Sequence, residues 1–437
     1  MNGSRELRGE CAIDVDRPLV LRSWPSEVWG TRERTRAVAF LLLLFCFAVI
    51  AWYISLALRV DGNNDNDAAY YLGVAKYMLR TGRFEENIVW QFLDQPTSVF
   101  HRPFTYWQGL PALALVPVLA LFRGPHAPFV FMAIVSGSAL LLLWYLVTIA
   151  APLAHPLARA VTLFTFGLSP AMTSYRVDTD TVPWMHLWIV ASLVALATSR
   201  WKTAACIGFL MLWTRGDGVV LCAFVWGTCL WAIWRTGGSP IRTIVPLLLT
   251  CAGLAVIHVA LCWLLHGRVP SKATWQAPRL TNYWDLYAFD QSPKLISWVQ
   301  RCRLKHVGAA FWTAMSNLRS TPFAPAQDVW FALILLVGWR NVRWQWSRPV
   351  WMLLFVGSSA IVLLSGPMFS EWRTLYTMLP LVALAAGAMV DAMLDRMGSL
   401  SSVVGGRRFG LVFVELATGA ALFAALFSAI RPLPPPM

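Results

Sequence analysis

Long apolar runs separated by short polar turns dominate this chain. The clearest are Phe40 to Leu58, Phe129 to Ala150, Ile244 to Leu265 and Leu411 to Ile430. At 1.5 Å per residue, helical runs of about 15 to 25 residues can cross a hydrocarbon layer roughly 30 Å thick. A β-barrel would instead show short segments of alternating polarity. The pattern predicts an all-α, multi-pass integral membrane protein.

Eleven transmembrane helices account for the apolar runs. The predicted spans are 37–58, 127–150, 157–171, 183–199, 201–214, 218–234, 243–265, 328–339, 350–366, 374–391 and 410–430. Two long outer loops remain, at 59–126 and 266–327, together with a cytoplasmic stretch at 392–409. This division predicts an N-terminal tail at 1–36, a membrane module at 37–265, the second loop, and C-terminal membrane helices at 328–437.

The first outer loop is expected to contain two helices that lie in the membrane interface. Apolar residues within 68–79 have the spacing of an amphipathic helix. The segment 104–122 is apolar enough to cross, but Arg102-Pro103 and Arg123-Gly124-Pro125 flank it and favour an interfacial position. Counting it as a span would reverse the side of every later loop.

Composition and charge support this membrane topology. Of the 437 residues, 57% are hydrophobic and only 13% are charged, which excludes a water-soluble fold. The net charge of +14 is dispersed among loops, so we expect no nucleic-acid partner. Arg32, Arg34 and Arg36 directly precede the first span and predict an uncleaved signal anchor with a cytoplasmic N-terminus in the inner (plasma) membrane.

Two acidic segments at the outer ends of spans are the first candidates for chemistry. Asp67 follows the first span within an Asp- and Asn-rich stretch, where it could also be an ordinary helix N-cap. Asp178 and Asp180 flank Thr179 between the third and fourth spans, and either could bind a cation or a substrate hydroxyl. The alternative for the second segment is again N-capping, ahead of Pro183.

Arginines at the same ends could bind phosphate. Arg373 closes the segment Phe369–Arg373, and Arg215 lies in an Arg-Gly-Asp-Gly turn. Guanidinium is permanently charged and matches phosphate oxygens geometrically. An interfacial arginine that only reaches toward lipid headgroups, or a glycine-rich reversal between helices, would look the same. Carboxylates beside cations at this boundary suit a reaction between a lipid phosphate and a polar acceptor.

The ordered set of motifs between about 60 and 380 resembles the GT-C superfamily, integral membrane glycosyltransferases that use polyprenyl-linked sugars. The matching segments are Asn66–Ala75 with Gly82, His101–Trp107 with Gly124-Pro125, Asp178-Thr179-Asp180, Leu210–Arg215 and Arg373–Pro380. In turn they resemble the family's first acidic motif, its interfacial helix, the second acidic motif of oligosaccharyltransferase catalytic subunits, and two recurring helix termini.

The resemblance implies roles for individual residues. Asp67 would be the catalytic carboxylate and Asp178 or Asp180 a supporting acid. The same three carboxylates would be the ligands of any Mg²⁺ or Mn²⁺ ion. The expected donor-phosphate contacts are Arg373, Arg215 and Arg268, and the expected substrate contacts are Tyr70, Tyr71, His101 and Glu371.

The predicted function is transfer of a sugar from a polyprenyl-phosphate donor to an acceptor hydroxyl on a glycan, lipid or protein, in the synthesis of cell-envelope glycan or glycoprotein. Attack in line with the leaving phosphate predicts inversion at the anomeric carbon. Tyr283 precedes Trp284-Asp285 where oligosaccharyltransferases have a Trp-Trp-Asp signature, so a monosaccharide transferase is favoured. A multi-pass transporter or lipid-sugar flippase is the alternative, and a non-catalytic assembly subunit is a third possibility.

Overall fold

The computed structural model describes residues 32–63, 66–85, 108–169, 173, 175–215, 218–235, 240–266, 377 and 379–404. All regular secondary structure within these residues is helical. The predicted spans at 328–339, 350–366 and 410–430 lie outside the described residues, as does the second outer loop from residue 267 to residue 327.

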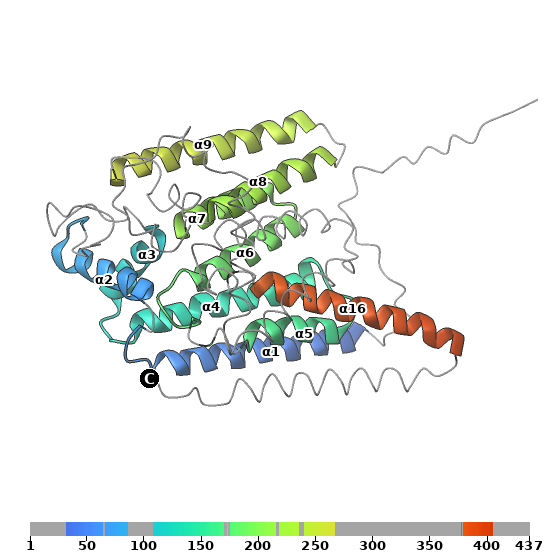
Figure 1. Cartoon of the computed structure of the whole chain (residues 1–437). Helices are drawn as coiled ribbons and strands as arrows, with labels where there is room; N and C mark the ends of the chain where they lie inside the picture. Colours follow the sequence, from blue (N-terminus) through green and yellow to red (C-terminus); the bar gives the residue numbers. More distant parts are fainter. Residues whose placement is uncertain are drawn as a thin grey trace, which may run out of the picture.

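Ten α-helices and one π-helical turn build this part of the chain (Figure 1). Eight of them form the main bundle: α1 (Arg32–Ala57), α4 (Ala127–Tyr145), α5 (Pro156–Gly167), α6 (Val182–Ala197), α7 (Trp201–Thr214), α8 (Gly218–Arg235), α9 (Pro240–His266) and α16 (Leu379–Val404). A π-helical turn, η1 (Leu146–Ala150), continues α4, and the other two helices are α2 (Asn66–Thr81) and α3 (Leu110–Leu121).

Three of these helical segments are long and apolar enough to cross a membrane. They are Arg36–Ala57, Ala127–Ala150 and Thr243–Leu261. The chain is therefore a membrane protein, as its composition predicted. The number of spans, eleven, stays a prediction.

Hydrogen bonds between neighbouring helices fix their directions. The indole N–H of Trp144, near the end of α4, donates to the Ala39 carbonyl near the start of α1 at 3.0 Å. Trp188, early in α6, donates to Thr214 Oγ1 at the end of α7 at 2.9 Å. Both pairs are therefore antiparallel. Figure 1 shows α2 and α3 at the end of the bundle where α1 finishes and α4 begins, which we call the Asp67 end.

The chain sequence explains where several helices begin. Pro128, Pro156 and Pro183 each lie in the first turn of α4, α5 and α6. Proline suits this position because its fixed φ is helical and the first-turn N–H groups have no partner within the helix. Like α5, α3 has 12 residues and is about 18 Å long, less than a crossing requires. Its position relative to the membrane surface stays a prediction.

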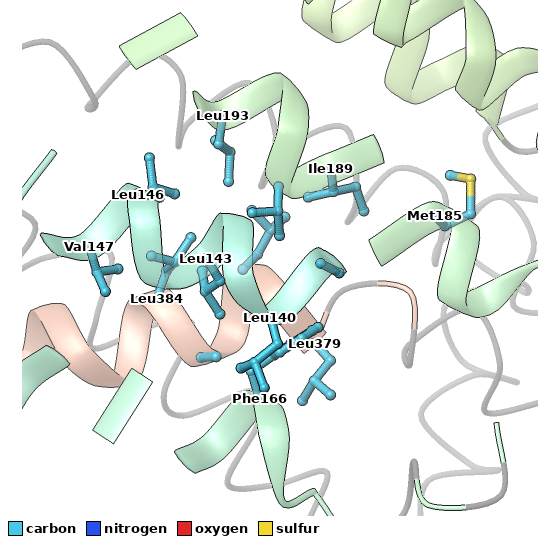
Figure 2. Packing of buried hydrophobic residues seen from close by; sticks show 14 of the residues in the cluster. Leu140, Leu143, Leu146, Val147, Phe166, Met185, Ile189, Leu193, Leu379 and Leu384 are labelled. Atoms are coloured by element: carbon cyan, nitrogen blue, oxygen red, sulfur yellow. The ribbon is translucent and has the colours of Figure 1, made fainter. Parts of the chain in front are cut away.

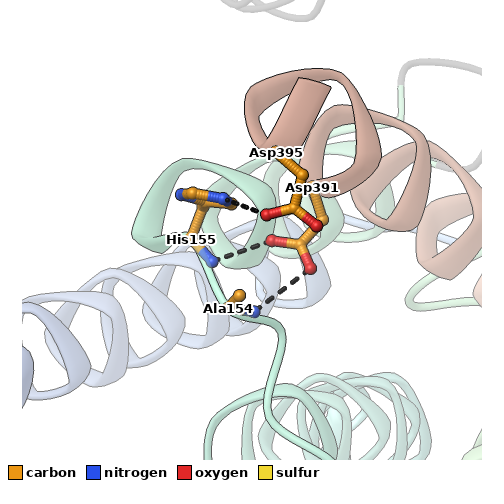
Figure 3. Close-up of polar contacts among 4 residues, drawn as sticks. All are labelled: Ala154, His155, Asp391 and Asp395. Carbon is orange, nitrogen blue, oxygen red and sulfur yellow. Dashed lines mark hydrogen bonds and ion pairs between the residues drawn. The ribbon is translucent and has the colours of Figure 1, made fainter. Parts of the chain in front are cut away.

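Two predicted segments differ from the structure in length. The span predicted at 157–171 is a helix that ends at Gly167. The span predicted at 374–391 corresponds to α16, which continues to Val404 through most of the expected cytoplasmic stretch at 392–409. The polar part of α16 is held against the start of α5: Asp391 accepts hydrogen bonds from the backbone N–H groups of Ala154 (3.2 Å) and His155 (2.8 Å), as Figure 3 shows.

The core lies where α4, α5, α6 and α16 meet. Leu140 and Leu143 of α4, Phe166 of α5, Ile189 of α6 and Leu384 of α16 are fully buried there (Figure 2). Lipid tails are as apolar as leucine, so helices in a membrane associate through close packing and interhelical hydrogen bonds rather than through burial from water. This packing fixes the relative positions of the helix ends, and with them the candidate site.

Candidate active site

The segment 175–181 is attached to the start of α2 at the Asp67 end. The Thr179 hydroxyl donates to the Ala68 carbonyl at 2.6 Å and also lies 3.0 Å from the Asn63 side-chain oxygen. A hydroxyl has one proton, so both contacts are satisfied together when the Asn63 amide turns its NH₂ group toward Thr179. Two acidic segments that are more than a hundred residues apart in the chain are thereby joined.

Asp67 is the residue directly before this attachment point. The helix α2 begins at Asn66, so Asp67 lies in its first turn rather than at the N-cap position, and its side chain is half-buried. A carboxylate is stabilised there by the positive end of the helix dipole. The hydrogen bond from Thr179 to Ala68, which we call the tether, holds the backbone next to Asp67 beside segment 175–181.

Asp178 and Asp180 are both buried, at 2% and 1% exposure. The Asp178 carboxylate accepts from the Thr179 N–H at 2.9 Å. Asp180 accepts from the Thr181 N–H, and from the Thr181 hydroxyl at 2.9 Å. Hydrogen bonds to a carboxylate compensate part of the free energy lost on removing its charge from water. These two acids are therefore held within the protein at this end.

Arg215 joins the same network from the end of α7. Its guanidinium donates to the Thr181 hydroxyl at 3.3 Å, and that hydroxyl in turn donates to Asp180. Thr181 is the N-cap residue of α6, as one alternative predicted, but its side chain makes no capping hydrogen bond. It instead links an acid of segment 175–181 to a cation of the neighbouring turn.

Arg176 anchors segment 175–181 to the neighbouring helices, and it was not among the site residues predicted from the sequence. Its guanidinium lies 4.3 Å from the Phe166 ring centre, donates to the Phe166 carbonyl, and lies 3.5 Å from His186 Nδ1. Its backbone carbonyl accepts from the Ser136 hydroxyl at 2.7 Å. Three helices, α4, α5 and α6, thus hold one residue.

Arg176 is a charged residue in a buried environment, which is unusual. Its side chain is fully buried, and burial lowers the pKa of the guanidinium, while the nearby Tyr53 hydroxyl opposes that shift. An arginine stays protonated at neutral pH even so. The sequence alone does not reveal this burial, because it depends on helices that are distant in the chain.

The two tyrosines predicted to contact substrate pack between α2 and α3. Tyr70 and Tyr71 are 3% and 1% exposed, and their rings meet edge to face at 5.4 Å. They share a cluster with Ala112 and Leu115 of α3. A role in holding α2 against α3 follows directly from these contacts, whereas contact with a substrate stays a prediction.

The remaining predicted site residues cannot be placed. Arg373, Arg268, His101 and Glu371 lie outside the described residues. Throughout the part of the chain that the structure describes, no group of three or more His, Cys, Asp or Glu side chains is arranged to hold a metal ion. A metal site formed by Asp67, Asp178 and Asp180 stays a prediction.

No protein-family model and no curated protein matches this chain. Solved structures do match. The oligosaccharyltransferase of Archaeoglobus fulgidus in complex with Zn and sulfate has a TM-score of 0.52 and 14% identity, with 91% of this chain and 53% of that chain covered. The apo form of that enzyme has a TM-score of 0.50 and 14% identity, with 92% of this chain and 56% of that chain covered. ArnT from Cupriavidus metallidurans bound to undecaprenyl phosphate has a TM-score of 0.49 and 14% identity, with 84% of this chain and 63% of that chain covered.

The match to the Archaeoglobus enzyme establishes the fold. This chain shares the helical fold of the Archaeoglobus fulgidus oligosaccharyltransferase, so the fold expected from the motif resemblance is confirmed. The chain spans a little over half of the length of that enzyme.

Proposed function

We propose that this protein is a membrane glycosyltransferase of the GT-C type, with its active site at the Asp67 end. It transfers a sugar from a polyprenyl-phosphate donor to an acceptor hydroxyl of a glycan, lipid or protein. The observation that carries the proposal is the bond from Thr179 to Ala68, which brings Asp67 beside a segment holding two further acids. The shared fold of the Archaeoglobus oligosaccharyltransferase supports the same class of reaction.

Asp67 is the proposed general base. As the acceptor oxygen attacks the anomeric carbon, its proton passes to the Asp67 carboxylate and a new C–O bond forms. The bond from that carbon to the phosphate oxygen breaks, and the lipid phosphate leaves with the electron pair. Because the attack is in line, the product is inverted. Phosphate is already a good leaving group, so no strong general acid is required.

Arg215 balances the charge that develops on the departing phosphate. It is half-buried, and it is linked through Thr181 to Asp180, so its guanidinium is held in a defined position. A fixed cation in a poorly solvated site stabilises a developing anion more strongly than water does. Arg373 and Arg268 are proposed as further phosphate contacts. No step of the reaction is assigned to a metal.

The proposed topology follows from the same chemistry. The N-terminus is cytoplasmic, the Asp67 end faces the outer side of the inner membrane, and residues 37–265 form the catalytic module. Polar acceptors of the cell envelope would reach the site from that side. The second outer loop at 266–327 and the helices within 328–437 complete the proposed arrangement.

The test is a transfer assay on purified protein in detergent. The purified protein is incubated with a labelled polyprenyl-phosphate sugar and with membranes that lack this protein and supply the acceptor. We expect Asp67→Asn to reduce transfer by about 10²- to 10⁴-fold, the usual contribution of general base catalysis. Arg215→Met is expected to reduce it as well. Glu85→Gln is the matched control, since Glu85 lies beyond the far end of α2 and pairs only loosely with Arg83, at 4.0 Å.

Three results would contradict the proposal. Wild-type transfer by Asp67→Asn would exclude Asp67 as the base. Movement of the unmodified donor across a liposome bilayer, without sugar transfer, would identify a flippase. The protein would be an assembly subunit if it shows no transfer activity and if the Asp67→Asn variant still restores full function to cells that lack the wild-type protein.

A further inference from the structure

A hollow opens at the Asp67 end, along the side of α2. It has a volume of about 380 Å³ and lies between α2 and the turn that joins α3 to α4. Lys76 and Arg80 of α2 and Arg123 of the turn line it, and Asp61 contributes one carboxylate. The groove therefore carries an excess of two positive charges.

The spacing of residues along α2 explains why these groups share one wall. Lys76 and Arg80 are four residues apart and lie on one face of the helix. The opposite face, with Tyr71 and Met78, is buried against α3. The charged face of α2 is therefore turned away from its helix partner and toward the groove.

Among the residues that the structure describes, the three cations of the groove have no acidic partner. Within the described residues, no carboxylate lies within 4 Å of Lys76, Arg80 or Arg123, and all three side chains are exposed. Arg80 lies 5.9 Å from the ring centre of Tyr77, a contact that leaves its N–H groups available. A cluster of like charges without counter-ions favours an anionic ligand.

Apolar side chains surround the charged wall. Leu79 is 42% exposed and Phe122 is 62% exposed, and both line the groove. The groove also adjoins the ends of two helices that are long enough to cross a membrane: Asp61 follows α1, and the turn containing Arg123 precedes α4. A ligand that fits must carry a negative group and an apolar part at the level of the bilayer surface.

We propose that this groove binds the phosphate headgroup of an anionic glycerophospholipid of the surrounding bilayer. The phosphate lies against Lys76, Arg80 and Arg123, and the upper part of the acyl chains packs on Leu79 and Phe122. The volume suits a headgroup rather than a long polyprenyl chain. The site is separate from the tether at Ala68 and does not depend on the proposed sugar transfer, because lipid binding is measured directly.

The experiment compares phosphatidylglycerol with phosphatidylcholine as additives to the purified protein in detergent. Binding is measured as the lipid concentration that gives half of the maximal rise in thermal transition temperature. The triple variant Lys76→Gln/Arg80→Gln/Arg123→Gln removes the charges of the groove. A lysine or arginine near an anionic lipid contributes about a fivefold increase in affinity, so we expect about a hundredfold loss for the triple variant.

The control variant is Arg59→Gln/Arg83→Gln, which removes two exposed cations from the same end but outside the groove. It is expected to keep the wild-type response to phosphatidylglycerol. An unchanged transition temperature of the triple variant in phosphatidylcholine shows that it folds.

Four results would overturn the proposal. They are an equal response of wild type and triple variant, an equal loss in the control variant, competition by millimolar inorganic phosphate, and preference for polyprenyl phosphate over phosphatidylglycerol. The third would identify a small-anion site and the fourth a donor site. Failure of the transfer assay alone would leave the lipid result standing.

Discussion

Replacing Gly387 with alanine tests whether α16 packs on α5 as closely as the structure indicates. A Cβ at Gly387 would lie 2.8 Å from the Ala158 carbonyl oxygen and 3.1 Å from Leu153 Cδ1, and would overlap Thr162 Oγ1. The carbonyl belongs to the α5 backbone and cannot rotate away. Since a close C···O contact is about 3.3 Å, the two helices would have to separate by about 0.5 Å.

The energetic consequence has two opposing parts. Overpacking of this kind usually costs about 1–3 kcal/mol. Separation would also stretch the bonds that Asp391, one helical turn beyond Gly387, accepts from Ala154 and His155 at 3.2 and 2.8 Å. Against this, alanine favours the helix over glycine by about 1 kcal/mol. We expect Gly387→Ala to destabilise the protein by about 1–2 kcal/mol and Gly387→Val by more.

The measurement is thermal unfolding of purified protein in detergent, with Gly253→Ala as the matched control. Gly253 is also inside a long helix, but a Cβ there meets no atom within 4 Å, so this variant is expected to be neutral or slightly more stable. Adding Thr162→Ala to Gly387→Ala removes one of the clashing groups and should restore part of the loss. The reasoning is refuted if Gly387→Ala and Gly253→Ala raise the transition temperature equally.

Two further substitutions probe the contacts at opposite ends of the bundle. Thr179→Val removes the hydroxyl that joins segment 175–181 to α2, so we expect sugar transfer to fall at least tenfold. Thr179→Ser keeps the hydrogen bond and should keep most of the activity. Equal transfer rates for the two variants would show that this hydrogen bond has no part in the activity. Asp391→Ala removes two charge-assisted hydrogen bonds worth about 1.5–3 kcal/mol each. It should lower the thermal transition temperature more than Asp391→Asn, which retains one acceptor oxygen. Identical transition temperatures for the two variants would show that Asp391 does not stabilise the start of α5.

Several elements could be predicted closely because their signals are local. The prediction at 201–214 coincides with α7, and the prediction at 127–150 coincides with α4 and its π-helical extension. Hydrophobic run length indicates both segments, and Pro128 marks the start of α4, without reference to the rest of the chain. The far part of α16 was missed for the converse reason: its polar residues beyond Asp391 are not typical of a span.

The site shows the same division. The acids Asp67, Asp178 and Asp180 stood out because carboxylates at the ends of apolar runs are rare and visible in the chain itself. Arg176 did not stand out, because a loop arginine and a buried one have the same sequence signature. Three helices, separated by loops, have to assemble before its environment exists.

The sequence alone determined that this is a helical membrane protein with acidic groups at the ends of its helices, since run length, hydropathy and residue type are properties of short segments. Only the tertiary structure decided that Thr179 reaches Ala68, that α16 extends along α5, and that Lys76, Arg80 and Arg123 share one groove. Such contacts join residues tens to hundreds of positions apart. They depend on how whole helices pack, and no local pattern in the chain specifies that packing.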